Sequence, residues 1–362
     1  MTKSYTTSVD AGNGGVNAVI AGRGKQGYKS YYMPSVRAAA TGDSLGLGPE
    51  WELDYQWVEW NGHRYITGDD VTRITKRGLE RHTGSNRYGN ELQQFLVAKA
   101  LAELGVKEGQ VNLTVFAPPG LFVQARQDML ERFMQDPPVT IFLKGDKAAR
   151  HWTYSNISVW PEGIGAAACF VLDKNGKHVS SDILSGETVI LDAGAHTLDA
   201  LKFSDGNFNP EQLEHATWEA GGVDVHIRQP ILRTVHKADS DFTNITVDDI
   251  DRAIRLGTVS GDYTLKAGGR EINLESLLNK YRTRYAEWVA NNIADGVFGG
   301  FKGIKSVILV GGGAYFIADH MAEWYGDKLL DAKSHATTKG IPYEDMNAVG
   351  GLRLALLQAE QA

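Results

Sequence analysis

Residues 8–20, SVDAGNGGVNAVI, and residues 190–202, ILDAGAHTLDALK, carry the same pattern in the two halves of the chain. In register, Asp10-Ala11-Gly12 falls on Asp192-Ala193-Gly194, with apolar residues on both sides. Each stretch is a β-like run, a glycine-containing turn and a second β-like run, which is typical of a hairpin. The repeat predicts a duplicated domain. Coincidence is the alternative, because short matches arise by chance.

The first glycine turn also invites comparison with a dinucleotide-binding loop. Asn17 stands where the G-x-G-x-x-G pattern needs its third glycine, and residues 16–20 continue as a strand instead of opening a helix. The dinucleotide interpretation is therefore excluded.

Predicted strands and helices alternate along the rest of the chain. Helices are expected at 90–104, 121–134, 164–172, from 315 onward and in the last residues, and strands at 111–116, 157–160 and 306–310. Such alternation indicates an α/β protein. A chain of 362 residues fits two domains, and we expect the first at 1–154 and the second at 155–344. The final helix, 345–362, is expected to return to the first domain.

Composition excludes some classes of protein. With 37 Lys and Arg against 44 Asp and Glu the net charge is −7, which argues against a basic groove that wraps nucleic acid. One cysteine favours a reducing compartment. The first residues lack the apolar core of a signal peptide, and no apolar run approaches the ~20 residues of a membrane helix. We expect a cytoplasmic protein without a membrane span.

The two glycine turns are candidate phosphate-binding loops. Glycine lets backbone N–H groups approach phosphate oxygens closely, and Thr197 adds a hydroxyl donor. Asp10 and Asp192 directly precede the turns, and carboxylates with phosphates between them suit Mg²⁺. The alternative is that each aspartate only caps a turn.

Two further segments carry candidate chemistry. Glu162 follows Pro161 at a strand end, where it can orient or deprotonate a water for attack on phosphorus, or simply stabilise a helix N-terminus. Gly311-Gly312-Gly313, after an apolar strand, can let an adenine lie flat against the backbone, although a plain strand–turn–helix junction is the alternative.

In order, these segments resemble the five nucleotide-binding signatures of the superfamily of actin, sugar kinases and heat-shock chaperones. The matching segments are the two phosphate loops at 9–14 and 191–199, the two connecting segments at 159–166 and 347–351, and the adenosine motif at 310–314. The resemblance implies two actin-like (ribonuclease H-like) domains, each a mixed sheet flanked by helices, around a nucleotide cleft.

Within that superfamily the chain most resembles the prokaryotic actin-like proteins of the plasmid-segregation (ParM-like) and archaeal kind. The short length, Pro161-Glu162-Gly163 and the segment Ala220-Gly221-Gly222-Val223-Asp224 support this narrower resemblance. It implies an ATPase that binds ATP or ADP with Mg²⁺ and polymerises into filaments.

The resemblance also implies roles for individual residues. Asp10 and Asp192 would position Mg²⁺, Glu162 would place the attacking water, and Asp192 would take part in catalysis. The nucleotide would be held by a larger set: Gly12, Asn13, Gly14, Asn17, Gly194, Ala195, His196, Thr197, Gly221, Asp224, Gly311, Gly312 and Gly313. Of these, Asp224 would lie near the ribose or base. The family often has a lysine at the position of Asn17, so another cation can be needed here.

The expected use is plasmid or DNA segregation, or intracellular positioning, by a filament of copies of the chain. The acidic charge favours contact with DNA through an adaptor protein, with no direct binding of nucleic acid. Two alternatives stay open: a small-molecule kinase of the same superfamily, and a scaffold that binds nucleotide and hydrolyses it weakly. The sequence does not distinguish ATP from GTP, and it reveals neither filament architecture nor cargo.

Overall fold

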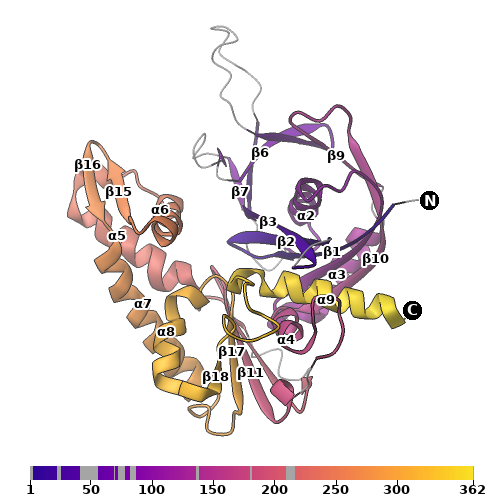
Figure 1. Ribbon diagram of the computed structural model, residues 1–362. Helices are drawn as coiled ribbons and strands as arrows, with labels where there is room; N and C mark the ends of the chain where they lie inside the picture. Colours follow the sequence, from indigo (N-terminus) through magenta and orange to yellow (C-terminus); the bar gives the residue numbers. More distant parts are fainter. Residues whose placement is uncertain are drawn as a thin grey trace, which may run out of the picture. The chain divides into compact units, whose positions relative to one another are not determined.

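The computed structural model describes residues 3–22, 26–40, 56–68, 70–71, 78–81, 87–135, 138–179, 182–208 and 217–361. Its contacts divide the chain into two compact units (Figure 1). Unit 1 consists of residues 1–181 and 333–362, and unit 2 of residues 182–332.

Unit 1 is built on a mixed sheet. Ten strands of its described part follow the order β3-β2-β1-β8-β10-β9-β5-β6-β4-β7. They are β1 (Ser4–Ala11), β2 (Gly15–Ala21), β3 (Tyr28–Pro34), β4 (Val36–Ala39), β5 (Trp57–Trp60), β6 (His63–Thr67), β7 (Leu79–Arg81), β8 (Glu108–Ala117), β9 (Val139–Leu143) and β10 (Arg150–Pro161). β8 runs parallel to both β1 and β10, while the other pairs are antiparallel.

Four helices accompany this sheet in the described part of unit 1. They are α2 (Glu91–Glu103), α3 (Phe122–Gln135), α4 (Ile164–Val171) and α9 (Met346–Gln361). α2 and α9 both pack against β1 and β2, and Figure 1 shows α2 inside the curve of the sheet. Because the sheet curves around α2, side chains on almost every side of the helix are buried rather than those along one face only.

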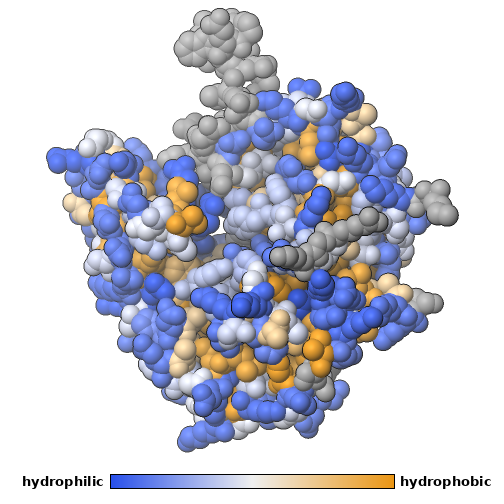
Figure 2. All heavy atoms as spheres, viewed as in Figure 1, coloured by the Kyte–Doolittle hydropathy of each residue, from blue (hydrophilic) through white to orange (hydrophobic). Residues whose placement is uncertain are grey.

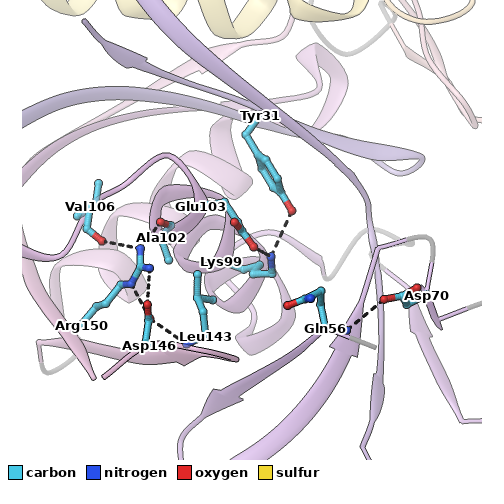
Figure 3. Close-up of polar contacts among 10 residues, drawn as sticks. All are labelled: Tyr31, Gln56, Asp70, Lys99, Ala102, Glu103, Val106, Leu143, Asp146 and Arg150. Carbon is cyan, nitrogen blue, oxygen red and sulfur yellow. Dashed lines mark hydrogen bonds and ion pairs between the residues drawn. The ribbon is translucent and has the colours of Figure 1, made fainter. Parts of the chain in front are cut away.

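Two charged side chains fasten α2 inside the sheet (Figure 3). Lys99 is buried, pairs with Glu103 and donates to the Tyr31 hydroxyl at 3.2 Å, while burial lowers the pKa of its ammonium group. Arg150, on β10, pairs with Asp146 at 2.7 Å and donates to the carbonyl of Ala102 near the end of α2. Because buried Lys99 and half-buried Arg150 each have a carboxylate partner, the structure tolerates both charges.

Unit 2 has a smaller sheet of the same kind. In its described part the order is β13-β12-β11-β17-β18, with β14 also paired to β12. The strands are β11 (Glu187–Ala193), β12 (Leu198–Ser204), β13 (Asn207–Phe208), β14 (Thr217–Trp218), β17 (Ser306–Val310) and β18 (Leu329–Leu330), and β15 (Thr264–Ala267) and β16 (Arg270–Asn273) form a separate hairpin. The helices are α5 (Gln229–Ala238), α6 (Val247–Ser260), α7 (Glu275–Val289) and α8 (Ala314–Tyr325).

The predicted duplication is confirmed by strand order. In unit 1, β3-β2-β1 form an antiparallel meander, followed by β8 and β10, which continue parallel to β1. In unit 2, β13-β12-β11 form the same meander, followed by β17 and β18 parallel to β11. Each unit therefore repeats one five-strand arrangement, and both sheets are mixed and flanked by helices, as the sequence predicted.

The boundary expected between the domains differs from the one that the contacts give. The domain boundary expected at Tyr154 falls inside β10, which pairs with β8 from His151 to Pro161. The contacts instead divide the chain after Ser181, and residues 333–362 join unit 1. The final helix expected at 345–362 is α9, which contains the segment 347–351. The small residues of that segment allow α9 to cross α4 closely.

Apolar residues are scattered over the surface. Figure 2 shows a viewed face that is mostly hydrophilic, with hydrophobic residues in separate small areas. The exposed apolar side chains include Val123 and Met134 on α3 and Leu256 and Val259 on α6. Within the described residues, no helix is both long and apolar enough to cross a membrane.

Candidate functional site

The two predicted hairpins have the same geometry. β1 and β2 pair with Ala11 opposite Val16, and β11 and β12 pair with Ala193 opposite Leu198, so each loop contains four residues. The first amide of each loop donates to its last carbonyl: Gly12 to Gly15 at 3.0 Å, and Gly194 to Thr197 at 2.9 Å.

Each loop has amides left over for a ligand. In the described part of the chain, the amides of Asn13 and Gly14 donate no hydrogen bond, and neither do those of Ala195, His196 and Thr197. Successive free amides in a tight loop form a concave site for an anion. Both loops can therefore bind phosphate oxygens through the backbone.

Ser35 holds the carbonyl side of the first loop. Its hydroxyl donates to the Gly12 carbonyl at 2.6 Å, and its amide donates to the Gly14 carbonyl at 3.4 Å. With the carbonyls engaged in this way, the amides are the groups that the loop offers to a ligand. Sequence reasoning missed Ser35, since nothing in its local pattern connects it to a loop more than 20 residues earlier.

Asn347 connects the aspartate of unit 1 to the segment that carries the candidate base. Its Nδ2 donates to Asp10 Oδ2 at 3.3 Å, and its Oδ1 accepts from the Gly163 amide at 2.9 Å. Asn347 lies on α9 and is buried. The sequence placed it in a signature segment without giving it a role.

Glu162 stands between β10 and α4. Its amide donates to the Ala117 carbonyl at 2.8 Å, and the residue is 9% exposed. The N-cap of α4 is Gly163, which has φ +93°. Glu162 therefore directly precedes the N-cap of α4, and its carboxylate lies next to the helix N-terminus.

In unit 2, the glycine triplet follows β17 and lies against the end of β11. Gly313 donates its amide to the Ala193 carbonyl at 2.7 Å. Gly311 has φ +82°, and a Cβ there would lie 2.3 Å from Asp192 Oδ1. A side chain is therefore excluded beside Asp192. Gly311 and Gly313 are needed to bring this turn against the end of β11, while a Cβ on Gly312 would meet nothing within 4 Å.

The segment 221–224 covers the carbonyl side of the second loop. The amides of Gly222, Val223 and Asp224 donate to the carbonyls of His196, Gly194 and Ala195, at 3.0, 3.1 and 2.8 Å respectively. Gly222 allows this approach, because a Cβ there would lie 2.4 Å from the backbone of His196. The predicted residues of unit 2 thus form one connected cluster.

Asp224 is held within an ionic network. Its carboxylate accepts from His196 Nδ1 at 2.9 Å and from Arg228 Nη1 at 2.6 Å, and Arg228 also pairs with Asp251. Burial by itself would raise the pKa of Asp224, but the His196 hydrogen bond and the charge of Arg228 together hold it below its usual value. The carboxylate therefore stays ionised.

The remaining predicted residues divide between the units. Asp10, the first loop, Asn17 and Glu162 belong to unit 1, while Asp192, the second loop, Gly221 and the glycine triplet belong to unit 2. Asn17 lies directly across the hairpin from Asp10, as Asp199 lies across from Asp192. Asn17 is buried, and its Oδ1 has no hydrogen-bond partner among the residues that the structure describes.

The carboxylates of the candidate site suit a metal that is bound partly through water and substrate. Among the described residues, no three His, Cys, Asp or Glu side chains gather as they would in an all-protein metal site. Mg²⁺ commonly needs only one or two carboxylates together with water and substrate phosphates. Asp10 and Asp192, each next to a loop of free amides, fit that mode of binding.

Comparison with known proteins matches both halves of the chain to sequence families. Residues 8–165 match the N-terminal domain of actin-like proteins, and residues 190–323 match the C-terminal domain of archaeal MreB-like actin homologues. A direct search of curated protein sequences finds no significant match.

Solved structures share the fold over nearly the full length. A crystal structure of an archaeal actin homologue is 18% identical, with a TM-score of 0.73 and coverage of 99% of this chain and 100% of its own. A 15-stranded ParM filament from Clostridium botulinum is 21% identical (TM-score 0.72; coverage 98% and 99%). Bacillus thuringiensis ParM with ATP is 16% identical (TM-score 0.68; coverage 99% and 99%).

Proposed function

From the premise that the chain belongs to the actin-like proteins, we propose that it binds ATP with Mg²⁺, hydrolyses it and assembles into filaments. The observation that carries the proposal is the pair of hairpin loops. Each has the same length, the same closing hydrogen bond, free amides and an aspartate two residues before its first glycine. One of the similar proteins holds ATP and another forms a filament.

The loops would bind phosphate oxygens of ATP through their amides. Gly12, Asn13 and Gly14 in unit 1, with Asn17 behind them, and Gly194, Ala195, His196 and Thr197 in unit 2 form this set. Asp10 and Asp192 would hold Mg²⁺ together with water and phosphate, and the metal would supply positive charge against the phosphates. The expected stoichiometry is one ATP per chain.

The nucleoside would be held in unit 2. Gly311, Gly312 and Gly313 offer backbone without side chains beside the second loop, which suits the flat face of an adenine. Gly221 and Asp224 border the same loop. Asp224 already accepts from His196 and Arg228, so its role is to fix His196 and to accept from a ribose hydroxyl with its remaining lone pairs.

Glu162 would orient the water that attacks phosphorus. Its carboxylate is mostly buried and stands at the end of a strand, and a carboxylate so placed would accept a proton from that water. Asp192 would assist by holding the metal. Hydrolysis would be coupled to assembly of copies of the chain in the cytoplasm.

Filaments of the chain would position DNA, such as a plasmid, or another cargo. Support for this use comes from the ParM-like resemblance, and the net charge of −7 favours an adaptor protein as the DNA contact. The alternatives, a small-molecule kinase and a weakly hydrolysing scaffold, are outcomes of the test.

The test measures ATP binding by calorimetry and phosphate release in the parent and in Glu162→Gln. We expect the variant to bind ATP and to lose about 10²–10⁴-fold in phosphate release, the range for a general base. Glu108→Gln, at the exposed start of β8, is the matched control and should behave as the parent.

Three results would contradict the proposal in different ways. No ATP binding by the parent would overturn it entirely. Equal phosphate release by parent and Glu162→Gln would remove Glu162 from the mechanism. Phosphate transfer to a metabolite, without pelletable polymer, would favour a kinase, while binding without turnover would favour a scaffold.

A further inference from the structure

A buried arginine lies beside the first phosphate loop. Nη1 of Arg87 donates to Asn13 Oδ1 at 2.5 Å, and its Nη2 donates to the Tyr88 hydroxyl. The guanidinium also lies over the Tyr88 ring, 4.5 Å from its centroid. Only 5% of the residue is exposed. A permanent positive charge is therefore held next to the loop of unit 1.

Arg87 has no counter-ion among the described residues. No carboxylate there pairs with it, and its Nε is buried without a hydrogen-bond partner. Arg37 shows the usual arrangement in the same unit, since it is equally buried and pairs with both Glu80 and Glu91. Of the five N–H groups of a guanidinium, Arg87 uses two within the described structure.

An unpaired buried charge is costly. Desolvation of an ion is compensated only by an opposite charge and by hydrogen bonds, and one aromatic face supplies a small part of that. The free amides of Asn13 and Gly14 on the same loop are also donors without acceptors. A multivalent anion would satisfy both the guanidinium of Arg87 and these two amides.

We propose that Arg87 binds a phosphate group of the nucleotide at the first loop. It supplies there the positive charge that the neutral side chain of Asn17 does not. The guanidinium offers parallel N–H groups that match two oxygens of one phosphate, while Asn13 and Tyr88 fix its orientation. The inference rests on the proposed function, because it assigns a residue to the phosphates of the same nucleotide.

A purely structural role makes the opposite prediction for the ligand-free protein. If Arg87 served only to fasten residues 87–90 to the loop, its removal would lower the melting temperature. If it awaits an anion, removal relieves an uncompensated charge, and the melting temperature without ligand stays level or rises. The two roles are therefore separated before any nucleotide is added.

The experiment compares the parent, Arg87→Gln, Arg87→Lys and the control Arg132→Gln, which removes an exposed cation whose side chain lies close to Gly89. Calorimetry gives the affinity for ATP, and competition gives the affinity for adenosine. Thermal unfolding is followed without ligand and with inorganic pyrophosphate.

We expect Arg87→Gln to weaken ATP binding by about 10- to 100-fold, as for loss of a charged hydrogen bond, and to leave adenosine binding unchanged. Pyrophosphate should raise the melting temperature of the parent and the control but not that of Arg87→Gln. For Arg87→Lys we expect an ATP affinity and a pyrophosphate stabilisation between those of the parent and of Arg87→Gln. The lysine keeps the positive charge but loses the paired N–H groups of the guanidinium.

Unchanged ATP affinity in Arg87→Gln would overturn the inference. A lower melting temperature of Arg87→Gln without ligand would overturn it as well. If the parent fails to bind ATP but pyrophosphate stabilises it through Arg87, the anion site stands and the proposed function falls. If neither ligand stabilises the parent, both are overturned.

Discussion

Single side chains of unit 1 bring together segments that are far apart in the chain. Asn347 bonds to Gly163, 184 positions away, and also to Asp10, while Arg87 reaches Asn13 across 74 positions. Each of these contacts places a polar group within the candidate site. None of them leaves a periodic pattern in the sequence.

Asp345, just before α9, makes the stability of unit 1 depend on pH. Burial, followed by the neighbouring charge of Glu344, raises the pKa of its carboxyl from the ordinary 3.8 to about 6. The Asp345 carboxyl then binds a proton more tightly in the folded chain than in the unfolded chain. Its contribution to the free energy of unfolding therefore falls as pH rises from about 4 to about 6. The cost at pH 7 is at most about 3 kcal/mol.

Asp345→Asn should therefore stabilise the chain at pH 7.5 by up to about 3 kcal/mol and have little effect at about pH 4, where the parent carboxyl is protonated. Denaturant unfolding at the two pH values checks this. Asp327→Asn, at an exposed position of unit 2, is the control. Equal stability of Asp345→Asn and the parent at pH 7.5 would show that the ionised Asp345 carboxylate does not destabilise the folded chain.

At the scale of elements, the crossing of α4 and α9 positions both connecting segments. A Cβ on Gly350 would lie 1.7 Å from the Gly165 carbonyl oxygen, and a Cβ on Gly165 would lie 2.3 Å from that of Asn347. Arg353, one turn further along α9, donates to the carbonyls of Cys169 and Leu172 at the end of α4. The two backbones touch, so that Asn347 can reach Gly163.

Gly350→Ala should destabilise the chain by about 3 kcal/mol or more, because the new methyl group would meet backbone that cannot move aside. Displacement of α9 should also weaken ATP binding through Asn347. Gly303→Ala is the matched control, since its Cβ would meet nothing within 4 Å. Denaturant unfolding with calorimetry tests both effects, and a stable Gly350→Ala that binds ATP normally would contradict this account.

Elements with strong local signals were predicted well. The helix expected at 90–104 is α2 with Asn90 as its N-cap, and the expected strand 306–310 is β17. β10 is longer than the predicted 157–160 because its first half is polar and is ordered by pairing with β8 and β9. A short stretch of sequence around residues 150–156 does not contain these partner strands, so it cannot predict the pairing.

At the scale of the whole molecule, assembly should depend on nucleotide. We expect the parent to pellet on ultracentrifugation with ATP and Mg²⁺ and to remain in the supernatant without nucleotide. Glu162→Gln should pellet with ATP, and its polymer should disassemble more slowly than that of the parent, because we expect the variant to bind ATP and to hydrolyse it slowly. Electron microscopy of the pellet distinguishes filaments from aggregates, and the same pelleting without nucleotide would contradict the coupling.

The sequence by itself determined the twin hairpins, their loop aspartates and the α/β class, because period-2 strands, glycine turns and helix boundaries are local properties. Tertiary structure alone decided that Arg87 lies beside the first loop and that Asn347 joins Asp10 to Gly163. These contacts depend on close packing between elements distant in the chain. Local sequence patterns do not predict which of these elements pack against each other.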